Sequence, residues 1–173
     1  MTILFRPVGF KELLLIADSG FRSFPPRLPE QPFFYPVLSV EYARKIAQGW
    51  NTKDEFSEYI GCVVQFEVDE AAIQRYPAQI AGGSLHQELQ IPAEELVEFN
   101  ASIIGTIKVI EVYIGEKAML VEFDESMSEA LKGACEATAQ WEDQYHASYD
   151  IDKLDNEFKR RLYKAPPKER DGT

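Results

Sequence analysis

His86 and Glu88 have the residue types and the spacing that most favour chemistry. They lie in residues 85–91, LHQELQI, where apolar and polar side chains alternate. A strand with this alternation places both residues on one face, about 7 Å apart. On a strand that lines a cleft, the carboxylate could stabilise a developing cation or act as a base, with the histidine as a nearby donor. A solvated strand face explains the same pattern, and both interpretations stay open.

Arg6 is the second candidate, because it lies among apolar residues in a predicted first strand, 2–8. A buried charge without a partner is very costly, so this guanidinium requires one. A structural ion pair with a carboxylate satisfies that need. A bound anion satisfies it equally, because the planar guanidinium fits a phosphate.

Residues 21–36, FRSFPPRLPEQPFFYP, contain five of the ten prolines. Each proline lacks a backbone donor and biases the residue before it toward extended geometry. The stretch therefore predicts an extended loop or a sheet edge. Arg22 and Arg27 lie within this stretch, and the interleaved aromatic residues indicate a loop packed on the core.

Composition excludes several classes of protein. A chain of 173 residues suffices for one sizeable core. Its formal charge of −11 argues against non-specific electrostatic binding of nucleic acid. No apolar run reaches membrane-spanning length. The two cysteines, Cys62 and Cys135, and the absence of a signal-like start predict free thiols and a cytoplasmic location. No metal-binding spacing is present, so no metal is expected.

The excess negative charge is concentrated in residues 111–157. This acidic band predicts a solvated face or a docking surface for a basic partner. We expect no nucleic acid and no membrane as partners, and the oligomeric state stays open.

The pattern of elements favours an α+β fold. An irregular order of strands and helices argues against a doubly wound parallel sheet. We predict an α+β core over 1–114, a helical C-terminal extension packed on it over 115–164, and a disordered tail over 165–173. Within the core, the expected strands are 2–8, 33–38, 61–69, 85–91 and 106–114, and the expected helices are 10–19, 40–50 and 94–99. We expect 61–69 to be half-buried and 106–114 to be central in the sheet.

Two segments carry a resemblance to a known group. LFRPVGFKELLLIADSGFRSFPPRLPEQPFFYPVLSVEYARKIA and HQELQIPAEELVEFNASIIGTIKVI resemble small bacterial proteins labelled "ADP-ribosylation/crystallin J1". The layout is more distantly similar to the ADP-ribosyltransferase fold, which implies a split mixed or antiparallel sheet with flanking helices. The resemblance covers roughly residues 2–114.

That resemblance implies a role for each matching position. Arg6 would take the first-strand position that contacts NAD, and Arg27 would help to hold the phosphates. Tyr35 or Ser39 would lie near the nicotinamide. Glu88 would hold the ribose and stabilise the cation, with His86 as an accessory, so NAD is the implied cofactor.

Two functions follow as expectations. The first is a non-catalytic or weakly catalytic interaction protein, of the immunity type, that docks through its acidic face. The alternative is an NAD-dependent ADP-ribosyltransferase or NAD glycohydrolase that uses Glu88 and Arg6. Convergence of Arg6, Tyr35, His86 and Glu88 on one cleft would favour the enzyme. A Glu88 exposed on an open face, together with an Arg6 engaged in an ion pair, would favour the interaction protein.

Overall fold

The computed structural model describes residues 1–82 and 86–118. The predicted core, 1–114, lies within this part of the chain apart from 83–85. Most of the predicted helical extension, 115–164, and the whole predicted tail, 165–173, lie outside the described residues, as does most of the acidic band. The described part is α+β, with small antiparallel sheets and short helices.

Three long strands form the central sheet. They are β1 (Thr2–Gly9), β3 (Ile60–Val68) and β7 (Ile103–Ile114), in the order β1-β3-β7 with antiparallel pairing throughout. The prediction that residues 106–114 form a central strand is wrong, because β7 lies at the edge and β3 occupies the middle. The predicted half-burial of 61–69 holds in the second half of β3, where Phe66 and Val68 are buried while Gln65 and Glu67 are part-exposed. It fails in the first half, which is buried on both faces through Val63.

The two main helices begin and end where local signals place them. Helix α1 (Phe10–Asp18) is followed by Gly20, whose φ of 72° suits a residue without a side chain. Helix α2 (Val40–Gly49) begins after Ser39, whose Oγ accepts a hydrogen bond of 3.2 Å from the backbone N–H of Tyr42. Such a cap satisfies one of the donors left free at a helix start.

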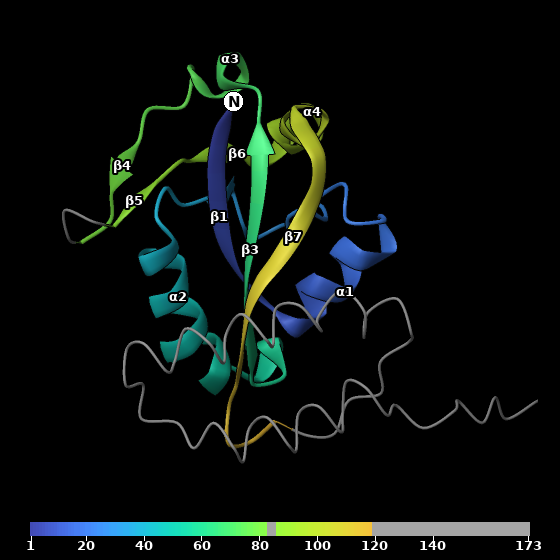
Figure 1. Cartoon of the computed structure of the whole chain (residues 1–173), viewed down its shortest axis with the longest axis vertical. Coiled ribbons are helices and arrows are strands. Elements are labelled where there is room, and N and C mark those ends of the chain that lie inside the picture. The colour runs from blue at the N-terminus through green and yellow to red at the C-terminus, as the bar shows by residue number, and fades with distance from the viewer. Residues whose placement is uncertain (83–85, 119–173) are drawn as a thin grey trace, which may run out of the picture.

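The helices flank the sheet (Figure 1) and bury its two faces separately. On one face, α1 places Phe10, Leu13 and Ile16 in a cluster with alternate residues of β1 and β3. On the other, Ala43 and Ala47 of α2 pack in a smaller cluster with Val63 of β3. Because side chains alternate along a strand, β3 supplies both clusters, which explains why its first half is buried on both faces.

Helix α2 approaches the sheet closely at Gly61. A Cβ placed on Gly61 would lie 2.2 Å from the backbone oxygen of Ala47, which is far inside van der Waals contact. The absence of a side chain therefore sets the distance between α2 and β3.

Short elements complete the described fold and extend the sheet past β1. Val37 exchanges two backbone hydrogen bonds with Phe5 of β1, of 2.9 and 2.8 Å, and forms a second bridge to Glu88. The short strands are β2 (Phe33–Phe34) paired with β6 (Ile91–Pro92), and β4 (Gln79–Ile80) paired with β5 (Gln87–Glu88). The short helices are η1 (Asn51–Lys53), η2 (Glu55–Ser57), α3 (Glu70–Ile73), η3 (Ala93–Glu95) and α4 (Leu96–Ala101).

Two predicted elements are shorter than expected. The strand at 33–38 is reduced to β2 and the bridge at Val37, and the strand at 85–91 is reduced to β5 and β6. None of the described helices has the length and apolarity needed to cross a bilayer.

Candidate binding site

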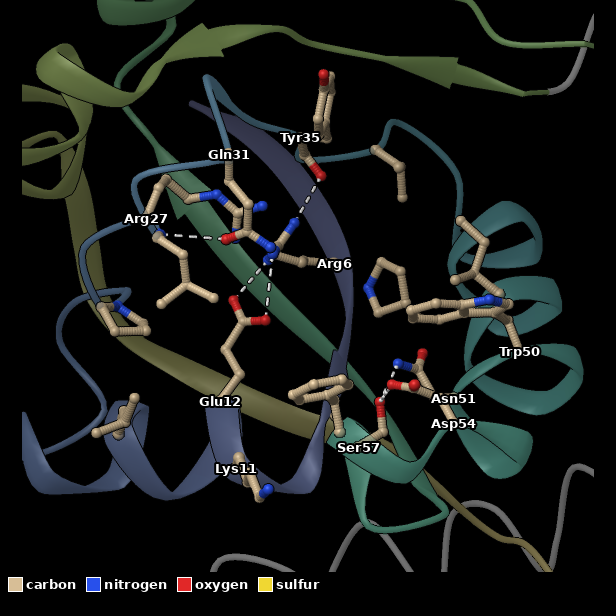
Figure 2. Close-up of a pocket in the computed structure, with 18 of the residues that line it drawn as sticks. Arg6, Lys11, Glu12, Arg27, Gln31, Tyr35, Trp50, Asn51, Asp54 and Ser57 are labelled. Carbon is tan, nitrogen blue, oxygen red and sulfur yellow. Dashed lines mark hydrogen bonds and ion pairs between the residues drawn. The ribbon is translucent and has the colours of Figure 1, made fainter.

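A cavity of about 590 Å³ opens beside β1, between the proline-rich loop and α1 on one side and the end of α2 with η1 and η2 on the other (Figure 2). Its volume is within the usual range of ligand sites. Four of the six residues singled out in the sequence line it: Arg6, Arg27, Tyr35 and Glu88.

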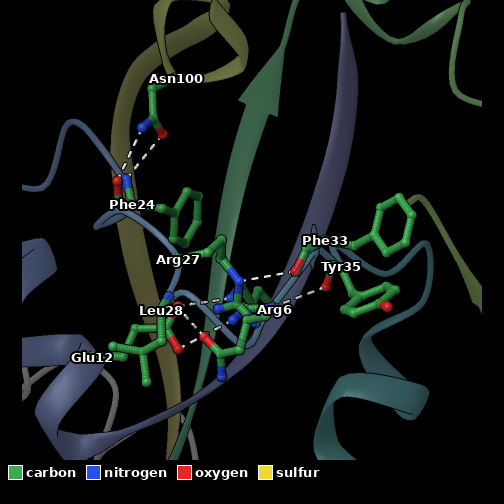
Figure 3. Close-up of polar contacts among 9 residues, drawn as sticks. Arg6, Glu12, Phe24, Arg27, Leu28, Phe33, Tyr35 and Asn100 are labelled. Carbon is green, nitrogen blue, oxygen red and sulfur yellow. Dashed lines mark hydrogen bonds and ion pairs between the residues drawn. The ribbon is translucent and has the colours of Figure 1, made fainter. Parts of the chain in front are cut away.

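Arg6 is engaged in an ion pair with Glu12 of α1. Its Nε and Nη2 donate to Glu12 Oε1 and Oε2 at 2.8 and 3.2 Å, and its Nη1 donates to the Tyr35 backbone oxygen at 3.2 Å (Figure 3). The guanidinium also lies over the Phe34 ring, 4.5 Å from its centroid. All three nitrogens therefore have protein partners, so the structural ion pair accounts for Arg6.

Arg27 lies beside this pair and is half-buried. Its Nε donates to the Phe33 backbone oxygen at 2.9 Å. Within residues 1–82 and 86–118, its terminal amino groups have no hydrogen-bond partner and it forms no ion pair. Burial, and then the neighbouring charge of Arg6, lower the pKa of Arg27, which Glu12 only partly opposes. Glu12 is thus the nearby carboxylate for two guanidinium groups but pairs with Arg6 alone, which leaves the terminal amino groups of Arg27 available on this side of the cavity.

Glu88 and His86 both contact Tyr42 of α2. The Tyr42 hydroxyl donates to Glu88 Oε2 at 3.5 Å, and the His86 ring stacks on the Tyr42 ring at 4.6 Å between centroids and 10° between planes. Burial, followed by the charge of Glu88, raises the pKa of Tyr42. Glu88 lines the cavity, but His86 is outside its lining. The structure therefore places His86 against Tyr42 and not in the cavity wall.

Ser39 is also outside the cavity lining, and its hydroxyl caps α2. Tyr35 lies in the wall and presents its backbone oxygen to Arg6 (Figure 3). Of the two residues placed by resemblance near a nicotinamide, only Tyr35 reaches the cavity.

The opposite wall holds residues that the sequence reasoning missed: Trp50, Asn51, Asp54 and Ser57 (Figure 2). Asn51 Nδ2 donates to Ser57 Oγ at 3.0 Å, and Ser57 Oγ donates to Asp54 Oδ2 at 2.6 Å. Asn51 Oδ1 is buried without a hydrogen-bond partner in the described part of the chain. Asn51 and Ser57 lie in the 3₁₀ turns η1 and η2, Trp50 follows the end of α2, and Asp54 lies between the two turns. Such short turns have no periodic sequence signal. The sequence signal that could have pointed to this wall is Trp50, a large apolar side chain at the end of a predicted helix.

A second polar cluster joins α2 to β7. Arg44 Nε donates to Glu111 Oε2 at 2.9 Å and its Nη2 donates to Oε1 at 2.5 Å, while the Tyr113 hydroxyl donates to Oε2 at 2.6 Å. Burial, reinforced by Glu111, raises the pKa of Tyr113. Glu111 is the first residue of the predicted acidic band, yet its burial removes it from any docking face.

The described residues contain no group of three or more His, Cys, Asp or Glu side chains arranged to hold a metal ion. Cys62 is a free, buried thiol in the centre of the sheet, and burial raises its pKa to about 12. Comparison with protein-family models, curated proteins and solved structures finds no match to this chain.

Proposed function

We propose that this chain is a non-catalytic interaction protein whose cavity beside β1 is its binding site. The observation that supports this most is the engagement of all three nitrogens of Arg6 by Glu12 and Tyr35. Because Nε and Nη2 already donate to the Glu12 carboxylate, Arg6 cannot offer that bidentate edge to a substrate phosphate. Within the described residues, His86 and Ser39 have structural contacts outside the cavity, and the side chain that contacts the Glu88 carboxylate is Tyr42.

The alternative is an NAD-dependent ADP-ribosyltransferase or NAD glycohydrolase. One observation favours it, because Glu88 lines the same cavity as Arg27 and Tyr35. Glu88 would stabilise the cation formed as nicotinamide leaves, and Arg27 would hold a phosphate. We also propose that the sheet has an ADP-ribosyltransferase-like arrangement. NAD would be the ligand of the enzyme, and the interaction protein would dock through the acidic band 111–157.

Nicotinamide release from NAD separates the two functions. The full chain is incubated with NAD, and nicotinamide is measured for the wild type, Glu88→Gln and the control Glu30→Gln, which alters an exposed loop residue. The interaction protein gives no release above background for any of the three. Release by the wild type and Glu30→Gln that is absent in Glu88→Gln would overturn the proposal and establish the enzyme.

A thermal-shift titration with NAD, ADP-ribose and nicotinamide accompanies that assay, because a ligand that binds only the folded chain raises the melting temperature. A shift with NAD that Arg27→Gln removes, without turnover, would place a nucleotide in the cavity of a non-catalytic protein. No shift at millimolar ligand would leave a protein partner as the occupant.

A further inference from the structure

Large apolar side chains stand exposed around the cavity. Leu15, Leu28, Trp50 and Phe56 line it with exposed fractions of 53, 56, 61 and 81%. They come from α1, the proline-rich loop, the end of α2 and η2, so separate parts of the chain build one apolar rim. Scattered apolar residues on a surface are ordinary, but a rim around one opening is typical of a surface that another molecule covers.

The basic and acidic side chains that line the cavity balance in number, since Asp54 and Glu88 line it too. Asp54 accepts a hydrogen bond from Ser57 and Glu88 accepts one from Tyr42, so among the described residues the unpartnered donors of Arg27 indicate what the covering molecule carries. Both oxygens of Glu12 are used by Arg6, and the terminal amino groups of Arg27 have no partner in the described part of the chain. A carboxylate on the occupant would accept two hydrogen bonds from this planar fork. Lys11 supplies a second cation at the rim, with its ammonium 5.7 Å from the centre of the Phe56 ring.

The edge of β1 indicates how the occupant is held. Phe5 directs its N–H and C=O outward to Val37. The next residue that faces outward is Pro7, which lines the cavity and has no N–H. A partner strand could not continue the ladder at this point, so recognition depends on side chains rather than on strand addition.

We propose that the cavity docks a segment of a partner protein in which one carboxylate is flanked by bulky apolar side chains. The carboxylate binds Arg27, and the apolar side chains pack on the rim formed by Leu15, Leu28, Trp50 and Phe56. This inference rests on the proposed interaction function and adds the chemistry of the partner. The cavity lining includes none of the described residues of the acidic band, 111–118.

A selection of phage-displayed random peptides on the full chain tests the proposal. The expected result is enrichment of sequences with an Asp, a Glu or a free C-terminal carboxylate between large apolar residues. The selected peptides are then synthesised with the acidic residue intact and with it replaced by its amide. Enriched sequences without a carboxylate, or with basic residues in its place, would overturn the proposal.

Matched variants locate the binding. Arg27→Gln is expected to weaken the acidic peptides roughly tenfold or more, and to leave the amide peptides unaffected. Arg22→Gln, at an exposed position outside the cavity, is expected to leave both unchanged. Because Arg27 also holds the Phe33 carbonyl, the melting temperature of each variant is measured alongside. Equal affinity of the acidic peptides for Arg27→Gln and Arg22→Gln would contradict the proposal.

Phe56→Ser tests the rim without disturbing the core, since this side chain is 81% exposed. Val97→Ser is its control, with the same exposed fraction on α4 and outside the cavity lining. Loss of peptide binding is expected in the first variant only. If no peptide is selected, or if sedimentation shows a dimer that Phe56→Ser dissociates, the chain's own residues or a second copy fill the cavity and the proposal is overturned.

The failure of this inference is distinguishable from the failure of the proposed function. Nicotinamide release that depends on Glu88 contradicts a non-catalytic protein. Selected peptides that lack a carboxylate, or that ignore Arg27, contradict the docking chemistry alone.

Discussion

Arg6 and Glu12 form a bidentate ion pair across the junction of β1 and α1, with side chains that are 9 and 22% exposed. The pair joins two consecutive elements, and the third nitrogen of Arg6 extends the link to the proline-rich loop at Tyr35. It therefore fixes the wall of the cavity in which Arg27 retains free donors.

Removal of the carboxylate from this pair should destabilise the fold. Glu12→Gln leaves Arg6 buried with fewer charged partners, so we expect the free energy of unfolding to fall by about 2 kcal/mol. Urea denaturation measures the change, and Glu30→Gln, at an exposed loop position, is the control. Equal midpoints for the two variants would show that the pair adds nothing to stability.

The buried pair of Arg44 and Glu111 should be strongly non-additive. Loss of either partner alone leaves the other as an uncompensated buried charge, so Arg44→Met or Glu111→Leu should each lower stability by about 3–5 kcal/mol. Replacement of both removes that penalty, and the double variant should be more stable than either single one. Denaturant unfolding of the three variants checks this. Simple addition of the two single losses would contradict it.

Tyr113 should make the protein sensitive to alkali. Its pKa is raised in the folded state, so between the unfolded pKa near 10 and the folded value the folded chain binds more protons. Stability is then fully present below pH 10 and falls above it, at about 1.4 kcal/mol for each pH unit.

Stability measured from pH 8 to 11.5 tests that sign. Tyr113→Phe loses its hydrogen bond to Glu111 and should be less stable at pH 8, yet its stability should decline less steeply above pH 10. A slope identical to that of the wild type would exclude Tyr113 as the alkaline-sensitive group.

Cys62 should be unreactive in the native protein. Its side chain is fully buried and its pKa is raised to about 12, so little thiolate forms at pH 8. Iodoacetamide at pH 8, followed by mass spectrometry of the peptide containing residue 62, should find labelling only after denaturation. Rapid native labelling at that residue would show that the centre of the sheet opens readily.

The sequence predicted best those elements whose signals are local. Gly20 after α1 and Ser39 before α2 mark helix boundaries by backbone geometry and hydrogen bonding within a few residues, and both predictions are confirmed. The order of the strands depends on pairing over long distances along the chain. The apolar, β-branched run of β7 therefore suggested a central strand, although β7 lies at the edge.

The candidate site was predictable only where its signals were local in the sequence. Arg6 was singled out because a charge stood among apolar residues, but its partner depends on how α1 folds back beside β1. Glu88 and His86 were placed on one face by alternation, and both indeed contact Tyr42. Only Glu88 lines the cavity, where its bridge to Val37 places it one chain segment away from β1.

The contact between Gly61 and Ala47 has a consequence for finding relatives of this chain. Any side chain at position 61 would push α2 away from the sheet, whatever the cavity binds. Sequences that diverge in ligand and in the residues of the rim should thus still share a glycine at that point in the middle strand. A sequence search that gives most weight to Gly61, rather than to Arg27 or Glu88, should therefore find proteins that share this fold even where their function differs.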